Sequence, residues 1–336
     1  MTEMEIRQVG PEDHQAVQDL VRIMTEAESF ENAYPTSHTP QETREALRNR
    51  DPSRCGQAFL GHVGGQAVVS GSFELPLNDN TEKAWCAVHV SPGDRRQGHG
   101  TRMAEFLVGA ARDRGRTTLM TSVGYPFDAD ESHPDRRFAA KHGFGFSQAE
   151  VHRVLTLPAD VEKLRQLATA AEPHHRDYTF RDFVGLPDES ILEDYCILLN
   201  NILVDAPSGK LEFEEGTDTP ATIVERVASL ADAGRTLYTS IAFDAAGVPV
   251  AHSQLVVPAH DPGNVYQWDT LVRRDHRGHR LGIATKVRNL EVVQARHPDR
   301  TILHTWNAES NGPMIAVNEA MGFVPARYEG EYYRNL

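Results

Sequence analysis

The chain has 336 residues, of which 40% are hydrophobic and 24% charged, a composition that excludes disorder as its main state. Its 34 Lys and Arg and 48 Asp and Glu give a net charge of −14, which disfavours binding to nucleic acid or to an anionic membrane surface. A chain of this length is expected to form two domains.

In chain order, the first half begins with a short strand and an amphipathic helix in "EIRQVGPEDHQAVQDLVRIM", followed by a helical patch in "PQETREALRNR". Three strand patterns come next, in "QAFLGHVGG", "QAVVSGSFEL" and "AWCAVHV". An Arg/Gly loop, "VSPGDRRQGHGTRM", then leads into a helix, a β-branched strand in "TTLMTSV" and a short helix that ends in Gly-Phe. This order predicts one α/β unit.

The second half repeats this order from "TFRDFVGLPDESILEDYCILL" to a second Gly-Phe. Matched positions keep a similar offset, because Arg277 minus Arg95 is 182 and Phe323 minus Phe144 is 179. The repeat predicts duplication of one unit. The expected domains are residues 1–157 and 178–336, with a polar helical linker at 158–177.

Each Arg/Gly loop precedes a predicted helix, whose first backbone N–H groups are unpaired and attract anions. Gly98 and Gly100 remove Cβ atoms that would keep a phosphate away from these amides, and Arg95 and Arg96 supply forked donors. No Gly-Lys-Ser/Thr follows, and the loop comes after the fourth strand, so it is neither a Walker loop nor the dinucleotide fingerprint. A diphosphate ligand is expected.

The loop resembles a motif of the GCN5-related N-acetyltransferase (GNAT) family: Val-x-Pro, two residues, then Arg/Gln-x-x-Gly-x-Gly/Ala after strand four. Val90, Pro92, Arg95, Gly98 and Gly100 match every element. The resemblance covers nearly the whole chain twice, as in tandem actinobacterial members of the mycothiol synthase type. It implies an α/β (α+β) fold, namely two tandem GNAT folds, each a mixed, mostly antiparallel central sheet flanked by helices.

The second loop departs from the motif, because Arg274 replaces the proline and Arg280 replaces the first spaced glycine. The resemblance implies acetyl-CoA as cofactor and no metal. It assigns cofactor binding to these residues: Leu271, Val272, Arg277, Gly278, His279, Arg280, Leu281, Gly282, Asn311, Val90, Arg95, Arg96, Gln97, Gly98, His99, Gly100 and Thr101.

The resemblance also implies direct acyl transfer from the thioester to a primary amine of a small molecule. The family often has a glutamate six residues before the valine of the motif, where this chain has Ala84 and Tyr266. We expect Asp269 to serve as the base instead, although an exposed strand aspartate fits it equally well. The tyrosine that commonly protonates the leaving thiolate is replaced by Asn318 in the second half and Ala139 in the first.

The second half is the expected site of transfer, because it keeps Asn311 where the family has an asparagine, a strand carboxylate and an uninterrupted last helix. The first half has Ser132 at the position of Asn311 and would bind cofactor without turnover or support the fold. Trp268 is expected to wall the acceptor pocket or to lie in the core. Glu212 would attract a cationic amine or belong to a solvated charged run.

Other functions stay open at this point. A silent CoA-binding sensor or scaffold would explain the missing glutamate and tyrosine, and an acyl-CoA hydrolase or O-acyltransferase would use the same fold. Three scattered cysteines and an acidic N-terminus without an apolar run favour the reduced cytoplasm. The pair His276 and His279 lacks the companions of a metal site. We expect a monomer or homodimer that binds neither nucleic acid nor membrane.

Overall fold

The computed structural model describes residues 4–36 and 39–336. Its strands form mixed, mostly antiparallel sheets flanked by helices, which confirms the predicted fold class. The chain divides into two compact units. Unit 1 contains the described residues up to Ala149 together with Gly209–Leu211 and Arg327–Leu336, and unit 2 contains Glu150–Ser208 and Glu212–Ala326.

Unit 1 is built on six strands in the order β1-β2-β3-β4-β5-β12, with a parallel pair only at β4 and β5. The strands are β1 (Glu5–Gln8), β2 (Arg54–Val63), β3 (Gln66–Pro76), β4 (Lys83–Val90), β5 (Thr118–Tyr125) and β12 (Val324–Asn335). The helices are α1 (His14–Glu28), α2 (Pro40–Leu47), α3 (His99–Asp113) and α4 (Pro134–Lys141), with a short turn η1 (Pro92–Asp94).

The two faces of this sheet are covered by different helices, because alternate strand residues point to opposite sides. Helix α1 packs through its buried apolar stripe against Leu60 and Ala67. Helix α3 packs against the other face, where Met103 and Leu107 contact a cluster that includes Phe59. Each helix is amphipathic, so burial of one stripe fixes which face it covers.

Unit 2 repeats this plan in the order β6-β11-β10-β9-β8-β7, with a parallel pair at β10 and β11. The strands are β6 (Gly145–Thr156), β7 (Thr179–Val184), β8 (Arg235–Phe243), β9 (Pro249–Pro258), β10 (Asn264–Val272) and β11 (Ile302–Ala308). The helices are α5 (Val161–Ala171), α6 (Leu192–Asn200), α7 (Ile202–Asp205), α8 (Pro220–Asp232), α9 (Leu281–Arg296) and α10 (Gly312–Met321). Short turns are η2 (Glu172–His174), η3 (Glu189–Ile191) and η4 (Arg274–His276).

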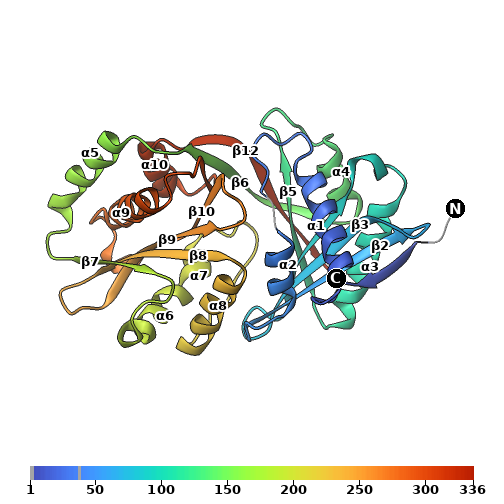
Figure 1. The fold of residues 1–336 in the computed structure, drawn as a ribbon, viewed down its shortest axis with the longest axis horizontal. Helices are drawn as coiled ribbons and strands as arrows, with labels where there is room; N and C mark the ends of the chain where they lie inside the picture. The colour runs from blue at the N-terminus through green and yellow to red at the C-terminus, as the bar shows by residue number, and fades with distance from the viewer. Residues whose placement is uncertain (1–3, 37–38) are drawn as a thin grey trace. The chain divides into compact units, whose positions relative to one another are not determined.

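The last strand of each repeat completes the unit formed mainly by the other repeat. Strand β12 pairs antiparallel with β5, from Tyr328 opposite Tyr125 to Asn335 opposite Thr118. Figure 1 shows β12, coloured red, running beside β5. In unit 2, β6 pairs in the same way with β11. The compact units therefore differ from the expected domains 1–157 and 178–336, whose independence stays a prediction.

The segment 158–177, expected to be a helical linker, contains α5 and η2, and both belong to compact unit 2. Helix α5 packs against both α9 and α10. Leu164 is only 1% exposed and joins a core cluster with Leu290 and Met321. The apolar stripe of the helix is buried, which makes this segment part of the unit 2 core.

Strand β10 contains a β-bulge, because Gln267 lies opposite Leu255 whereas Thr270 lies opposite Ser253. Gln267 is buried beneath the bulge and donates to the Gln254 carbonyl oxygen at 2.7 Å. Its Oε1 accepts a hydrogen bond of 2.9 Å from Lys286 Nζ. This buried hydrogen bond connects α9 with the bulged strand β10.

We expect substitution of Leu164 to show that the helix at 161–171 stabilises unit 2. Leu164→Ala should lower the free energy of unfolding by about 2–5 kcal/mol, because a cavity replaces a buried side chain. Val161→Ala, on the same helix but 68% exposed, is the control and should change it by less than about 0.5 kcal/mol. Urea unfolding measures both. Equal effects would mean that the helix is not part of the core.

Lys286 should make stability depend on alkaline pH. Burial lowers the pKa of its ammonium from 10.5 to about 7, so between these values the unfolded chain binds more protons than the folded one. The free energy of unfolding should therefore rise from pH 7 towards pH 10, by at most about 1.4 kcal/mol per unit. Denaturant titrations should show this rise in the wild type and in Lys141→Met, but not in Lys286→Met.

Candidate functional site

The parallel strands at the centre of each unit separate after a short pairing. Strand β4 pairs with β5 only from Lys83 opposite Thr118 to Trp85 opposite Met120, although both strands continue further. In unit 2, β10 pairs with β11 only from Asn264 to Tyr266. Beyond these residues, the neighbouring parallel strand no longer pairs with the backbone of β4 or β10. An extended ligand fits such an opening as an added strand would.

The loop after β4 ends at a helix N-terminus that carries no side-chain cap. Helix α3 begins at His99, and its N-cap residue Gly98 has φ of 88°. Arg96 is also left-handed, with φ of 66°. A Cβ at Gly100 would lie 3.3 Å from Phe138 and Val90, so the helix packs closely at this point. The first amides of α3 therefore remain available to an anion.

The loop after β10 has the same backbone conformation as the loop after β4, but its glycine and arginine are interchanged at the two left-handed positions. Gly278 takes the place of Arg96 with φ of 88°, and Arg280 takes the place of Gly98 with φ of 55°. The preceding residues also agree, with φ and ψ of −66° and 159° at Arg95 and of −71° and 158° at Arg277. Left-handed backbone at an arginine costs about 1–2 kcal/mol, a cost that falls on Arg96 in unit 1 and on Arg280 in unit 2.

The loop arginines have different surroundings in the two units. Arg95 Nε donates to the Val90 carbonyl oxygen at 3.3 Å, and its guanidinium lies 4.6 Å from the centre of the Phe30 ring. Arg277 Nε makes the equivalent bond to Val272 at 3.2 Å, but its Nη2 also lies 3.2 Å from a carboxylate oxygen of Asp205. Arg274 pairs with the same carboxylate, whose side chain is 6% exposed.

Other contacts at the start of α9 come from the segment that precedes β7. Arg280 Nη1 donates to the Ala170 carbonyl oxygen at 3.0 Å, and His279 Nδ1 lies 3.1 Å from the His174 carbonyl oxygen. The basic side chains of the second loop are thus bound to the protein. An anion at the start of α9 would have to compete with Asp205 for two arginines.

The structure places the residues predicted for chemistry in the second half at different depths. Trp268 and Asp269 are both exposed and lie in the bulge of β10, just before Leu271 and Val272. Asn318 is fully buried in α10 and donates to Asn307 Oδ1 at 2.5 Å. The catalytic roles of Asp269 and Asn318 and the acceptor-pocket role of Trp268 stay predictions.

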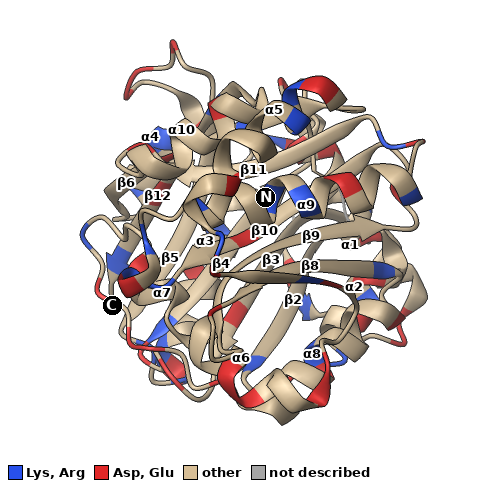
Figure 2. Ribbon diagram, turned by 90° about the vertical axis from the view of Figure 1, so that its left-hand side faces the viewer, with Lys and Arg blue, Asp and Glu red and all other residues tan. Residues whose placement is uncertain are grey.

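Two further predicted residues lie outside the bulge. Asn311 is the N-cap of α10, where its Oδ1 accepts from the Met314 amide at 3.4 Å. Glu212 lies exposed in the loop before α8. Figure 2 shows acidic residues on α6 and α8 as well. Thr101 of the first half lies in the first turn of α3, 3.3 Å from His142 Nε2.

A polar cluster in unit 1 was missed by the sequence analysis. Glu329 on β12 lies 3.3 Å from the guanidinium of Arg327, and Glu28 at the end of α1 lies 3.5 Å from His89 Nε2 on β4. Burial raises the pKa of Glu329 to about 7, Arg327 opposes this rise and Glu28 adds to it. The repeat contained a signal, because Glu329 minus Glu150 is 179, the same offset as between the two Gly-Phe segments.

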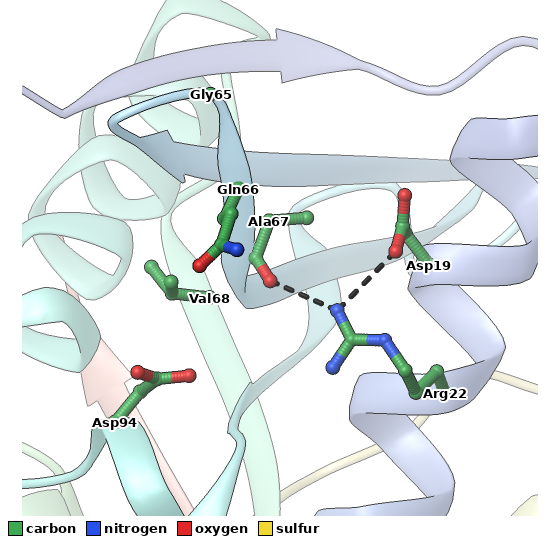
Figure 3. Close-up of a pocket in the computed structure, with 7 residues that line it drawn as sticks. All are labelled: Asp19, Arg22, Gly65, Gln66, Ala67, Val68 and Asp94. Carbon is green, nitrogen blue, oxygen red and sulfur yellow. Dashed lines mark hydrogen bonds and ion pairs between the residues drawn. The ribbon is translucent and has the colours of Figure 1, made fainter.

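A separate surface pocket in unit 1 is lined by Asp19, Arg22, Gln66 and Asp94, among others (Figure 3). Arg22 donates to the Ala67 carbonyl oxygen at 3.0 Å and pairs with Asp19, so its charge is already bound within the protein. The pocket contains none of the residues predicted to bind cofactor or substrate.

Among residues 4–36 and 39–336, no three histidine, cysteine or acidic side chains are grouped in a way that would hold a metal ion. No helix in the same residues is long and apolar enough to cross a membrane.

Known proteins resemble this chain in sequence. Residues 20–144 match the model of the Acetyltransferase (GNAT) family. A mycothiol acetyltransferase from Actinosynnema mirum is 30% identical over 113 residues, which are 33% of this chain and 36% of that protein. The match therefore spans about a third of the length of this curated relative.

Solved structures resemble the whole chain in fold. A tandem GNAT protein from the clavulanic acid biosynthesis pathway, described as without AcCoA, has a TM-score of 0.77 at 22% identity, with 99% of this chain and 98% of that chain covered. A GCN5-related N-acetyltransferase from Sphaerobacter thermophilus has a TM-score of 0.65 at 14% identity, with 99% and 95% covered. Residues 20–144 therefore match the Acetyltransferase (GNAT) family, and the whole chain is similar in fold to a tandem GNAT protein.

Proposed function

We propose that the protein is an acyltransferase that transfers an acyl group from a CoA thioester to a primary amine of a small molecule. The acyl group that we propose first is acetyl. The observation that carries the proposal is the opening between β4 and β5 next to an uncapped, glycine-containing start of α3. An extended thiol arm fits the opening, and a diphosphate fits the helix start.

The residues of unit 1 fit such a cofactor. Ser91 Oγ and His99 Nδ1 are buried at the loop and have no hydrogen-bond partner within the described chain. Arg95 makes no ion pair within the same residues. The amides from Gly98 onward and the two loop arginines would hold the diphosphate, and His89 and Val90 would pair with the arm. When bound, the cofactor supplies an acyl group activated as a thioester.

We place transfer in unit 1, although the sequence favoured the second half. Unit 2 has the bulge and Asp269, which support a site there. However, its loop arginines are paired with Asp205, Arg280 occupies the N-cap of α9, and α5 packs against both α9 and α10. The corresponding helices of unit 1 are α3 and α4.

Attack requires the free amine, whereas an alkyl ammonium has a pKa near 10, so a base must take its proton. Backbone N–H groups of β4 beyond Trp85 would stabilise the charge that develops on the thioester oxygen, by about 3 kcal/mol per donor. A silent CoA-binding protein would bind acetyl-CoA without amine-dependent thiol release. A hydrolase would release the thiol without forming an amide.

Calorimetry with acetyl-CoA tests which helix start binds the cofactor. Gly98→Val should weaken binding at least tenfold, because a side chain at a left-handed N-cap disturbs the amides of α3. The variant Gly282→Val, at the start of α9, should leave this affinity unchanged, since its Cβ would meet only Val272, at 3.6 Å. If Gly282→Val removes binding and Gly98→Val does not, the cofactor binds in unit 2.

Asp269→Asn tests the predicted base of the second half. With transfer in unit 1, the variant should keep the wild-type kcat for thiol release over a panel of primary amines. A tenfold or larger fall in kcat, with unchanged affinity for acetyl-CoA, would place the chemistry at the bulge of β10 instead.

A further inference from the structure

We propose that Glu329, on the exchanged strand β12, accepts the proton of the acceptor amine in unit 1. The inference deepens the proposed function and rests on it. Glu329 lies on β12 and not on β4. It comes from the second half of the sequence, although the first half forms most of unit 1.

Strand register places Glu329 beside the opening. Trp85 lies opposite Met120 in the last parallel pair. Continued by four residues along each separating strand, this register would bring His89 to the level of Gly124. Gly124 is in turn opposite Glu329 in the antiparallel pair of β5 and β12. Glu329 is therefore level with the part of β4 that is expected to hold the thiol arm.

The side chains at this level share one face of the sheet. Trp85 and His89 alternate with Cys86 and Val88, which pack on the α3 cluster, so Trp85 and His89 face α1. The contact between His89 and Glu28 of α1 agrees with this orientation. On β12, Tyr332 packs on the α3 cluster, so Glu329, an odd number of residues away, faces α1.

The strand next to Glu329 is adapted to a charged neighbour. A Cβ at position 124 would lie 1.4 Å from Arg327 Nη2, so glycine is required for the guanidinium to lie across β5. Arg327 Nε lies 3.3 Å from a carboxylate oxygen of Glu329, within ion-pair distance. The Glu329 side chain is 23% exposed, which leaves it accessible to an amine while most of its surface is removed from water.

The charges around Glu329 suit a base that works near neutral pH. The groups on the same face are Glu28 of α1, His89 of β4, and Arg327 and Glu331 of β12, whereas Ser122 and Gly124 of β5 carry no charge. A carboxylate with a pKa of about 7 is a stronger base than an exposed one and is still partly ionised at neutral pH. Glu28 and Glu329 together would also attract a cationic amine.

The step balances without a further reactant. The ammonium gives one proton to the Glu329 carboxylate, and the lone pair of the free amine forms the C–N bond to the acyl carbon. The C–S bond breaks and its electron pair leaves with the sulfur. The remaining extra proton of nitrogen goes to that thiolate, and Glu329 returns its proton to water.

The test compares Glu329→Gln with Glu150→Gln, because the repeat places Glu150 on β6 opposite Ala308 of unit 2. Thiol release from acetyl-CoA is followed with the best substrate of a primary-amine panel, and calorimetry measures acetyl-CoA affinity. Glu329→Gln should lower kcat/KM about a hundredfold at pH 7 with unchanged acetyl-CoA affinity, which also shows that the variant is folded. Glu150→Gln should keep the wild-type kcat/KM.

The pH profile separates a proton acceptor from a structural residue. Wild-type kcat/KM should fall below about pH 7 as Glu329 becomes protonated. This break near pH 7 should persist in Glu28→Gln, at a lower pH because Glu28 raises the pKa of Glu329. It should be lost in Glu329→Gln, whose kcat/KM should instead rise with the fraction of free amine towards the amine pKa of about 10. Wild-type kcat/KM in Glu329→Gln, or loss of activity in Glu150→Gln alone, overturns the role of Glu329. A wild type that binds acetyl-CoA but acylates no amine overturns the proposed function and this role together.

Discussion

Parallel pairing between β4 and β5 stops after three residue pairs, and the candidate site of unit 1 follows from that limit. The next residues of β4 keep β3 as a neighbour, so the strand stays in place while its other edge opens. The same break occurs between β10 and β11. An opening at the centre of a sheet exposes backbone donors and acceptors that a buried strand would otherwise have satisfied.

The two units share this architecture but differ at the helix that follows the opening. In unit 1 the glycine lies at the N-cap and the arginine before it, whereas in unit 2 the two residue types are interchanged. The backbone tolerates both arrangements, yet only Gly98 leaves the helix start without a side chain. Asp205 and the helix at 161–171 add to this difference by binding the basic residues and packing beside α9. The two units thus share a fold but differ in the surroundings of their loops.

Much of the fold was predictable because it depends on local patterns. The repeat, the strand and helix order and both Arg/Gly loops are visible in residue spacing. The pairing partner of an edge strand cannot be predicted from residue spacing, since β6 and β12 have similar sequence patterns and either sheet offers an edge for pairing. The helix at 161–171 looked like a polar connector because only a narrow stripe around Leu164 is apolar. Glu329 was missed for the same reason as the strand exchange, because its neighbours are set by tertiary pairing. The predicted cofactor and catalytic residues stay predictions.

The exchange of β12 has a consequence for biosynthesis. A nascent chain emerges from the ribosome with its N-terminus first, and N-terminal domains usually fold before C-terminal ones. Unit 1 cannot finish folding before unit 2 is synthesised, because β5 gains its antiparallel partner only when Arg327–Leu336 have been translated. Until then, β5 remains an open edge that invites pairing with other nascent chains. The proposed proton acceptor arrives with the same segment, so the unit would acquire its chemistry only at the end of synthesis.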